Sequence, residues 1–168
     1  MPVGRKGAIP RPVAMGDKIM TETTAEFVIY IINALANKKD LYPSYVYKKL
    51  QETECIQNYL VSFYDVLHTM GTEAIINDVE KYLKQRGVSF THSILIMSDN
   101  DLEQFYKEHL EEDIIKAFSS QNNISLEESM NLYYGSKLAN EIHEGRYGLQ
   151  YLDYSVLVNI LQKELNLC

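Results

Sequence analysis

The stretch that decides the fold class is Thr23-Thr24-Ala25-Glu26 together with the run FVIYIINALA at residues 27–36. Its first four residues have the Ser/Thr-x-x-Glu form of a capping box, which satisfies free amide groups at the start of a helix. The run that follows is rich in β-branched and aromatic residues and by itself could be a strand. Because a helix cap stands at its head and the apolar pattern continues to Ala36, we expect a helix that is buried on most sides.

Helical patterns also dominate the rest of the chain. The predicted fold is all-α, with two related four-helix units of about 60 residues each packed together around one core. We expect a flexible tail at residues 1–22, which hold three of the four prolines, and helical units at residues 23–87 and 99–168. Residues 88–98 are predicted to be an extended linker, with a strand paired to another chain as the alternative.

The evidence for two related units is a repeated order of elements. Each unit is predicted to have a long helix, a turn, a capped helix, a short helix, a loop with an aromatic residue and a final amphipathic helix. A shift of about 83 residues brings Asp40-Leu41 onto Asn123-Ile124 and Tyr64 onto Tyr147. The identity between the units is low, so this is a repeat of pattern.

Composition and charge argue against several classes of function. The chain has 168 residues and a net charge of -7, and an acidic surface disfavours nucleic acid because phosphates attract Lys and Arg. No apolar run approaches the roughly 18 residues that a membrane span needs, and no secretory signal is present. We therefore expect a cytoplasmic protein that does not bind membranes.

Motifs for catalysis and for metal binding are missing from the sequence. The two cysteines, Cys55 and Cys168, and the four histidines do not stand at metal-ligand spacing, and there is no phosphate-binding loop. We assign no catalytic residue, no metal ligand and no cofactor. The acidic residues of the predicted long helix, Glu108, Glu111, Glu112 and Asp113, are expected to form a solvated face.

The most distinctive local motif is FYDVLHTMG at residues 63–71. One interpretation is a functional site in which His68 carries a proton near physiological pH and Asp65 orients it. The other is a structured turn, in which Tyr64 anchors the loop and Thr69 or Thr72 caps the next helix. The second unit keeps only the tyrosine of this motif, so the shared architecture does not need Asp65, His68 and Thr69.

Tyrosine is unusually frequent, with 13 residues and no tryptophan. Tyrosine is enriched at protein interfaces because it buries a large area and keeps a polar tip. Tyr45 and Tyr147 therefore join Tyr64, Asp65, His68 and Thr69 as candidates for an interaction surface. The alternative is that the tyrosines line the crevice between the two units.

The first unit, from Glu26 to Gly87, resembles a family of small uncharacterised bacterial helical proteins. The resemblance rests on the apolar opening helix, on Val46–Leu50, and above all on residues 63–71 running into Ile75–Val79. Members of that family are often encoded beside ADP-ribosyltransferase-like, toxin-type proteins. The resemblance therefore implies a protein partner and an antitoxin-like role, and it supplies no catalytic residue.

Three functions follow as hypotheses. The first is a non-catalytic protein-binding module, with a toxin as the partner and a homodimer as a further form of association. The second is a nucleic-acid-binding transcriptional regulator, since short helices joined by tight turns allow a helix-turn-helix. The third is an enzyme that uses Asp65 and His68, which requires a concave pocket around His68.

Overall fold

The computed structural model describes residues 19–90 and 101–166, with backbone only for 101–105, and this part of the chain is helical without any strand. The predicted all-α fold is confirmed. In chain order the helical segments are α1 (Glu22–Lys39), α2 (Pro43–Glu52), the π-helical η1 (Ile56–Val61), α3 (Tyr64–Leu67), α4 (Thr72–Gln85), α5 (Asp101–Asn122), α6 (Leu126–Tyr134), α7 (Lys137–His143), the 3-10 helical η2 (Arg146–Tyr151) and α8 (Tyr154–Glu164).

Helix α1 forms where the apolar run predicts a helix, but it begins slightly earlier. Thr21, not Thr23, is the N-cap, and its hydroxyl accepts a hydrogen bond from the Thr24 amide at 3.3 Å. The Thr21 amide in turn donates to the Thr24 hydroxyl at 2.7 Å, so the capping box is a Thr–Thr pair. The expected capping box of Thr23 and Glu26 is therefore wrong. Thr24, at the third helical position, accepts the hydrogen bond from the N-cap amide that a glutamate accepts in the usual capping box.

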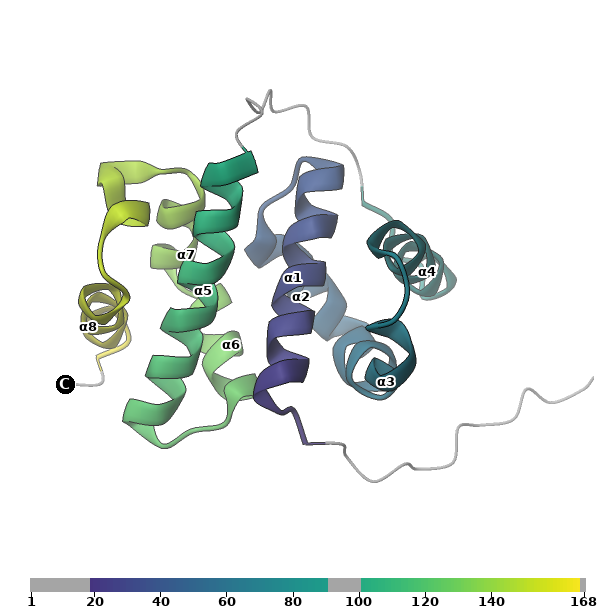
Figure 1. Cartoon of the computed structure of the whole chain (residues 1–168), viewed down its shortest axis with the longest axis horizontal. Helices are drawn as coiled ribbons and strands as arrows, with labels where there is room; N and C mark the ends of the chain where they lie inside the picture. Colours follow the sequence, from purple (N-terminus) through teal and green to yellow (C-terminus); the bar gives the residue numbers. More distant parts are fainter. Residues whose placement is uncertain (1–18, 91–100, 167–168) are drawn as a thin grey trace, which may run out of the picture.

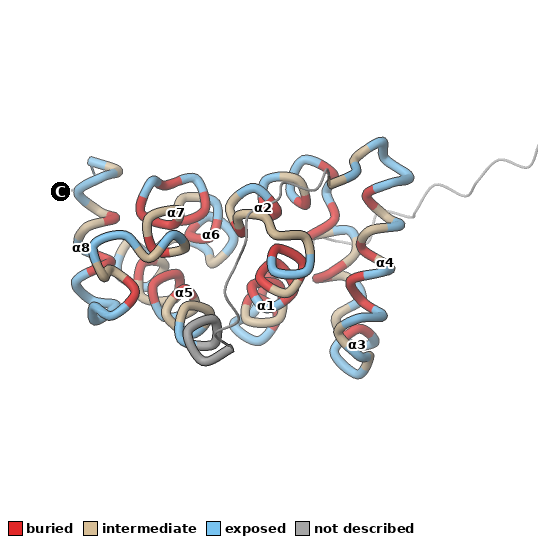
Figure 2. The backbone as a smooth tube through the Cα atoms, turned by 90° about the horizontal axis from the view of Figure 1, so that it is seen from above, coloured by how far each residue is buried: buried red, intermediate tan, exposed pale blue. Residues whose placement is uncertain are grey.

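Two long helices, α1 and α5, lie side by side in the middle of the molecule (Figure 1). Helices α2 and α4 pack on α1, and helices α6 and α8 pack on α5. Since α1 has neighbours on several sides, buried positions surround most of its circumference, as Figure 2 shows. A helix that is apolar nearly all round is stable only in such a position. One continuous hydrophobic core runs through both halves of the molecule.

The first half, residues 19–90, and the second half, residues 101–166, have helices at matching positions, although their third and fourth helical segments differ in type. Helices α2 and α6 begin 83 residues apart, at Pro43 and Leu126. Helices α4 and α8 begin 82 residues apart, at Thr72 and Tyr154. Each half has five helical segments when the single-turn elements are included. The common relationship of two four-helix units stays a prediction.

One expectation about α5 is wrong. Glu111 does not lie on a solvated face: it is only 3% exposed and faces α1 and α6. Its position follows from the helical period, because Glu111 precedes Ile114, Ile115 and Phe118 by three, four and seven residues. All three of those residues are fully buried, so Glu111 shares the buried stripe of α5.

Other expectations fall on residues outside the described part of the chain. The tail predicted for residues 1–22 has only residues 19–22 within the described range, and there Met20 is buried and α1 already starts at Glu22. Of the linker predicted at residues 88–98, only 88–90 are described, and they are not helical. Among the described helices, none has the length and apolar character that crossing a membrane requires.

Candidate functional site

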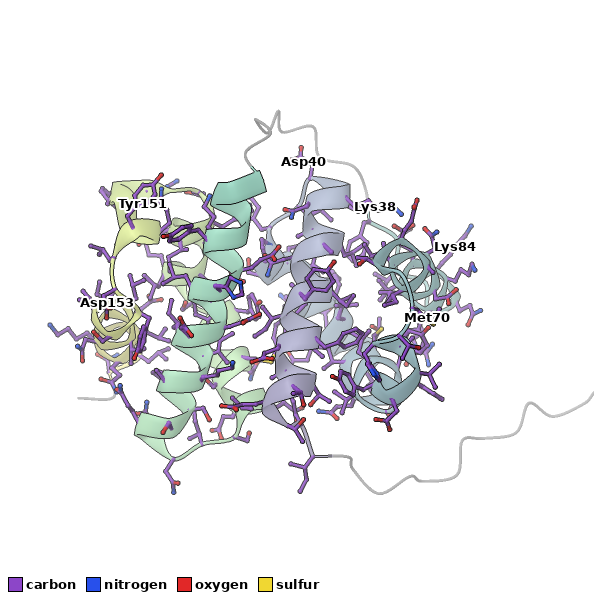
Figure 3. All side chains as sticks on the ribbon, viewed as in Figure 1. Lys38, Asp40, Met70, Lys84, Tyr151 and Asp153 are labelled. Carbon is purple, nitrogen blue, oxygen red and sulfur yellow. The ribbon has the colours of Figure 1, made fainter. Side chains whose placement is uncertain are left out.

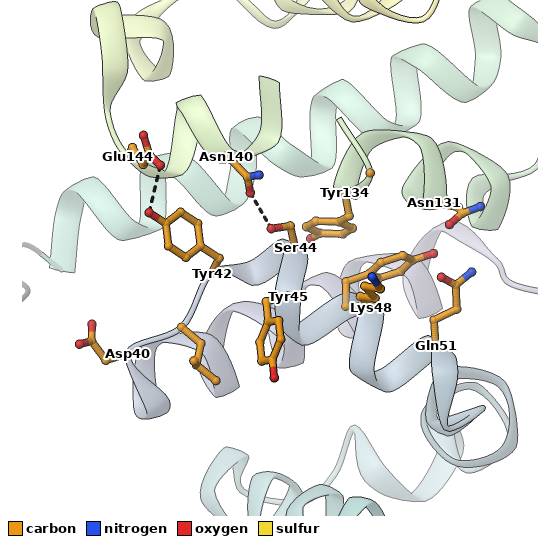
Figure 4. Close-up of a pocket in the computed structure, with 13 residues that line it drawn as sticks. Asp40, Tyr42, Ser44, Tyr45, Lys48, Gln51, Asn131, Tyr134, Asn140 and Glu144 are labelled. Carbon is orange, nitrogen blue, oxygen red and sulfur yellow. Dashed lines mark hydrogen bonds between the residues drawn. The ribbon is translucent and has the colours of Figure 1, made fainter. Parts of the chain in front are cut away.

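A groove lies between the two halves. It has a volume of about 880 Å³ and runs between α2 on one side and α6 and α7 on the other (Figure 4). Four tyrosines line it, namely Tyr42, Tyr45, Tyr47 and Tyr134. Pro43 starts α2 shortly after the turn at Asp40, and α2 packs on both α1 and α6.

Two hydrogen bonds join the walls at one end of the groove. The Ser44 hydroxyl donates to Asn140 Oδ1 at 2.5 Å, and the Tyr42 hydroxyl donates to Glu144 Oε1 at 3.0 Å (Figure 4). The hydrogen bond to the Glu144 carboxylate raises the pKa of Tyr42, and partial burial adds to it. The Tyr42 ring also packs against the His143 ring, with centroids 5.0 Å apart. These contacts hold α2 against α7 and close this end.

A stacked pair of tyrosines forms the inner wall of the groove. The rings of Tyr47 from α2 and Tyr134 from α6 lie 4.7 Å apart with an interplanar angle of 24°. Both residues are 4% exposed, and burial raises the pKa of each hydroxyl, so both stay neutral at physiological pH. The Tyr134 hydroxyl points away from the groove and donates to the buried Glu111 Oε2 at 3.2 Å. The wall of the groove is thus continuous with the core.

The opposite, open end of the groove is polar and accessible. Lys48, Gln51 and Asn131 are exposed there. Tyr45 is 40% exposed and its ring has Lys49 Nζ at 5.7 Å and the Phe90 ring at 6.2 Å. Aromatic side chains with a few polar groups at the rim are the composition of protein-binding surfaces.

The motif at residues 63–71 forms a separate, convex surface at α3. The Tyr64 ring packs edge-on against Phe27 at 5.3 Å and stacks on the His68 ring at 4.9 Å, so Tyr64 anchors the turn to α1. His68 is exposed, and its Nδ1 is hydrogen-bonded to the Tyr64 carbonyl at 2.7 Å. Asp65 is exposed on the same turn. A backbone carbonyl, one helical turn back, is therefore the group that orients His68.

Neither threonine caps α4, contrary to the expectation for a structured turn. The N-cap of α4 is Gly71, which makes no side-chain hydrogen bond. The Thr69 hydroxyl donates to the Val66 carbonyl at 2.7 Å, while the Thr72 hydroxyl pairs with the Tyr30 hydroxyl at 2.7 Å. Thr69 therefore closes the α3 turn, and Thr72 joins the start of α4 to α1.

Tyr147 presents its ring to solvent from a strained backbone. It is 86% exposed, with φ 56° and ψ 13°, in the left-handed region that a bulky L-residue rarely adopts. Gly145 and Gly148, on either side of it, also have positive φ. Tyr151 on the same turn is 73% exposed, at the opposite end of the molecule from α3 (Figure 3, with α3 labelled in Figure 1).

The structure does not gather the predicted interaction residues into one site. Tyr45 lies on the groove, Tyr64, Asp65, His68 and Thr69 lie at α3, and Tyr147 lies on η2. Tyrosines in the crevice between the two units were one of the two alternatives from the sequence, and Tyr42, Tyr47 and Tyr134 lie there. Sequence reasoning missed the other residues that build the groove: Ser44, Asn140 and Glu144. Tyr47 and Tyr134 each occupy a buried position of their helix, α2 and α6, which helical spacing can indicate. Their contact with each other depends on the packing of α2 on α6.

Comparison with known families places a similarity in the first half alone. Residues 26–86 match the model of a family described as a protein of unknown function (DUF3791). No curated protein and no solved structure matches the chain. The matched segment runs from the first turns of α1 to the end of α4 and contains the motif at residues 63–71. The expected resemblance to an uncharacterised family is confirmed for this segment, and α6 and α7, the second wall of the groove, lie outside it.

Proposed function

We propose that this protein is a non-catalytic protein-binding module and that its partner occupies the groove between α2 and α6–α7. The observation that carries the proposal is a groove of about 880 Å³ walled by four tyrosines. Tyrosine is among the residues that dominate binding energy at interfaces, where it fills pockets with little loss of conformational entropy. The stacked Tyr47–Tyr134 pair provides a rigid apolar inner wall, and exposed Tyr45 and Lys48 provide an accessible rim.

The resemblance of the first half suggests the kind of partner. We propose a toxin of the ADP-ribosyltransferase type, bound and neutralised in the cytoplasm. This finer proposal rests on the motif at residues 63–71 and on the toxin-type proteins that are often encoded beside proteins with this resemblance. The exposed residues Asp65, His68 and Thr69 would then form a second contact area. They lie in and directly after α3, in the half of the molecule that also contains α2.

The test compares groove variants with a matched surface control. Tyr45→Ala and Lys48→Glu change exposed groove side chains, and Tyr106→Ala removes a tyrosine that is 61% exposed on α5. The tagged proteins are purified from native cells, and any stoichiometric partner is then produced and titrated against each variant. Loss of an interface tyrosine costs about 2 kcal/mol at a hot spot, so we expect Kd to rise by about tenfold or more.

The outcomes separate protein binding at the groove from nucleic-acid binding. Tyr106→Ala should bind as the wild type does, while both groove variants bind weakly. Equal affinity of all variants for the partner would contradict the groove as the binding surface. Recovery of nucleic acid in place of a protein, with binding lost at high salt, would instead support the transcriptional regulator.

A further inference from the structure

The most unusual group in the core is the carboxyl group of Glu111. It receives three hydrogen bonds from two neighbouring helices: Asn33 Nδ2 on α1 donates to Oε2 at 2.9 Å, Tyr134 on α6 donates to Oε2 at 3.2 Å, and Tyr133 on α6 donates to Oε1 at 3.3 Å. Asn33, Tyr133 and Tyr134 are each at most 4% exposed. Glu111 therefore joins α1, α5 and α6 at the place where the two halves meet.

At this joint, the place where Glu111 connects α1, α5 and α6, no positive charge of the described residues balances the carboxylate. In the described part of the chain no basic side chain pairs with Glu111, and the charged group that acts on it is Glu108, one turn earlier on α5. The α1 partner Asn33 is uncharged, the α6 partners are tyrosines held neutral by burial, and Tyr47 of α2 lies behind Tyr134. Ion pairs on α5 join other residues, His109 to Glu112 and Lys116 to Glu26. An ionised buried carboxylate without a cation is costly even when it is hydrogen-bonded.

The same cluster also accommodates the neutral carboxyl group. A proton on Oε1 turns that oxygen into a donor, and the Tyr133 hydroxyl can accept it, because a phenol both donates and accepts. Oε2 keeps its two donors, Asn33 and Tyr134, in either state, but loss of the negative charge weakens both hydrogen bonds. The change between the two states therefore reverses the hydrogen bond between Tyr133 and Oε1, and the Tyr133 O–H then no longer donates to Glu111.

We infer that Glu111 is a proton-binding switch built into the joint between the halves, and that its protonation state sets the packing of the Tyr134 wall of the groove. Two contacts connect Glu111 to the groove: the Tyr134 hydroxyl donates to Glu111, and the Tyr134 ring stacks on Tyr47. The consequence for partner binding rests on the proposed function of the groove, whereas the switch itself does not.

The direction of the pH effect follows from the electrostatics. Burial raises the pKa of Glu111 from its ordinary value of 4.5 to about 7, the hydrogen bonds from Asn33, Tyr134 and Tyr133 oppose the rise, and Glu108 adds to it. Since the folded protein binds this proton more tightly than the unfolded chain, the stabilisation is complete below pH 4.5 and is lost as the pH rises to about 7. Within that window the contribution of Glu111 to the unfolding equilibrium constant changes by about tenfold per pH unit.

The shifted pKa values of His143 and Glu112 must be separated from that of Glu111. Burial lowers the pKa of His143, with help from Lys107, so its stabilisation is lost as the pH falls below 6.5. Burial raises the pKa of Glu112, which gives an effect of the same sign as Glu111. A difference between the wild type and a Glu111 variant removes both contributions.

The first experiment measures urea unfolding of the full chain from pH 4 to 8 for the wild type, Glu111→Gln and Asp113→Asn. Gln can keep the Oε2 contacts and does not titrate, and Asp113 is an exposed acid two residues further along α5. We expect the unfolding constants of wild type and Glu111→Gln to diverge by about tenfold per pH unit between pH 4.5 and 7. Asp113→Asn should follow the wild type, and parallel curves for wild type and Glu111→Gln would overturn the inference.

The second experiment needs no substitution at Glu111. Carboxyl ¹³C NMR of the full chain follows each Glu directly, and one midpoint near pH 7 is expected. Tyr133→Phe removes a hydrogen bond that favours the ionised form, so this midpoint should move upward and identify Glu111. If every Glu titrates near its ordinary value of 4.5, the switch is absent.

The same titration tests the link to the groove without a partner. The ring resonances of Tyr47 and Tyr134 should shift with the midpoint of Glu111, while the exposed Tyr106 ring should not. Constant Tyr47 and Tyr134 resonances across that midpoint would overturn the coupling. Failure of partner binding to the groove, in contrast, would leave this titration unchanged and would count only against the proposed function.

Discussion

The two halves of the molecule have the same turn after their long helix. Asp40 and Asn123 both adopt a left-handed backbone, with φ 55° and 54°. The next residue in each case donates its amide back to a carbonyl five residues earlier, Leu41 to Ala36 at 2.9 Å and Ile124 to Ser119 at 3.1 Å. Asp and Asn tolerate this backbone better than most residues, so each half ends its long helix by the same means.

The halves differ where the final helix begins. In the first half, the turn before α4 is a short regular helix, and Tyr64 packs inward on Phe27. In the second half, the turn before α8 is irregular, and Tyr147 projects outward from a strained backbone. The comparison teaches that the core-forming elements are shared between the halves, while the exposed turns differ.

The largest expected effect tests whether the halves form one cooperative unit. Leu35 on α1 and Phe118 on α5 stand 83 residues apart, and both are fully buried in the one core. Leu35→Ala and Phe118→Ala should each lower the free energy of unfolding by about 3–5 kcal/mol, because each leaves a cavity. Calorimetry should show a single transition at a lower temperature for both variants. Two separate transitions would show that the halves unfold independently.

A smaller effect on stability, of opposite sign in the two halves, is expected at the corresponding tyrosines Tyr64 and Tyr147. Tyr64→Ala removes the ring contacts with Phe27 and His68 and should cost about 1–2 kcal/mol of stability. Tyr147→Gly relieves the left-handed strain at an exposed site and should gain about 0.5–1 kcal/mol after the entropy cost of glycine. Urea denaturation measures both. A loss of stability in Tyr147→Gly would mean that the Tyr147 ring contributes to folding despite its exposure.

The smallest effect concerns the contact between the long and the final helix of each half. Lys39 and Glu80 form an ion pair of 3.1 Å between α1 and α4. The residues 82 positions later, Gln121 and Gln162, form a neutral hydrogen bond of 3.4 Å between α5 and α8. The double variant Lys39→Gln/Glu80→Gln should change stability by less than about 1 kcal/mol, since both side chains keep contact with solvent, at 27% and 29% exposed, and such ion pairs contribute little.

Salt dependence sharpens this last prediction. Ionic strength screens the Lys39–Glu80 pair and leaves the Gln121–Gln162 pair unaffected. The difference in stability between the wild type and the double variant should therefore shrink when salt is added. Gln121→Ala serves as the control, and its effect should be the same at low and at high salt.

The candidate site was less predictable from sequence than the fold. Pro43 marks the start of α2, and Ser125 and Gly135 mark the two ends of α6, by local chemistry that a sequence shows. The groove, however, depends on which helices become neighbours. Tyr42 and Glu144 are 102 residues apart in the chain and are joined only by the packing of α2 on α7. No local pattern contains that information.

The sequence by itself determined the helices, their order and the turns at Asp40 and Asn123, because helical periodicity and capping act over a few residues. Only the tertiary structure decided that Glu111 is buried and that Tyr47 and Tyr134 form the wall of a groove. An acidic residue is expected in solvent unless neighbouring helices supply its hydrogen bonds. Asn33 lies 78 residues from Glu111, so those donors become available only when α1, α5 and α6 pack together.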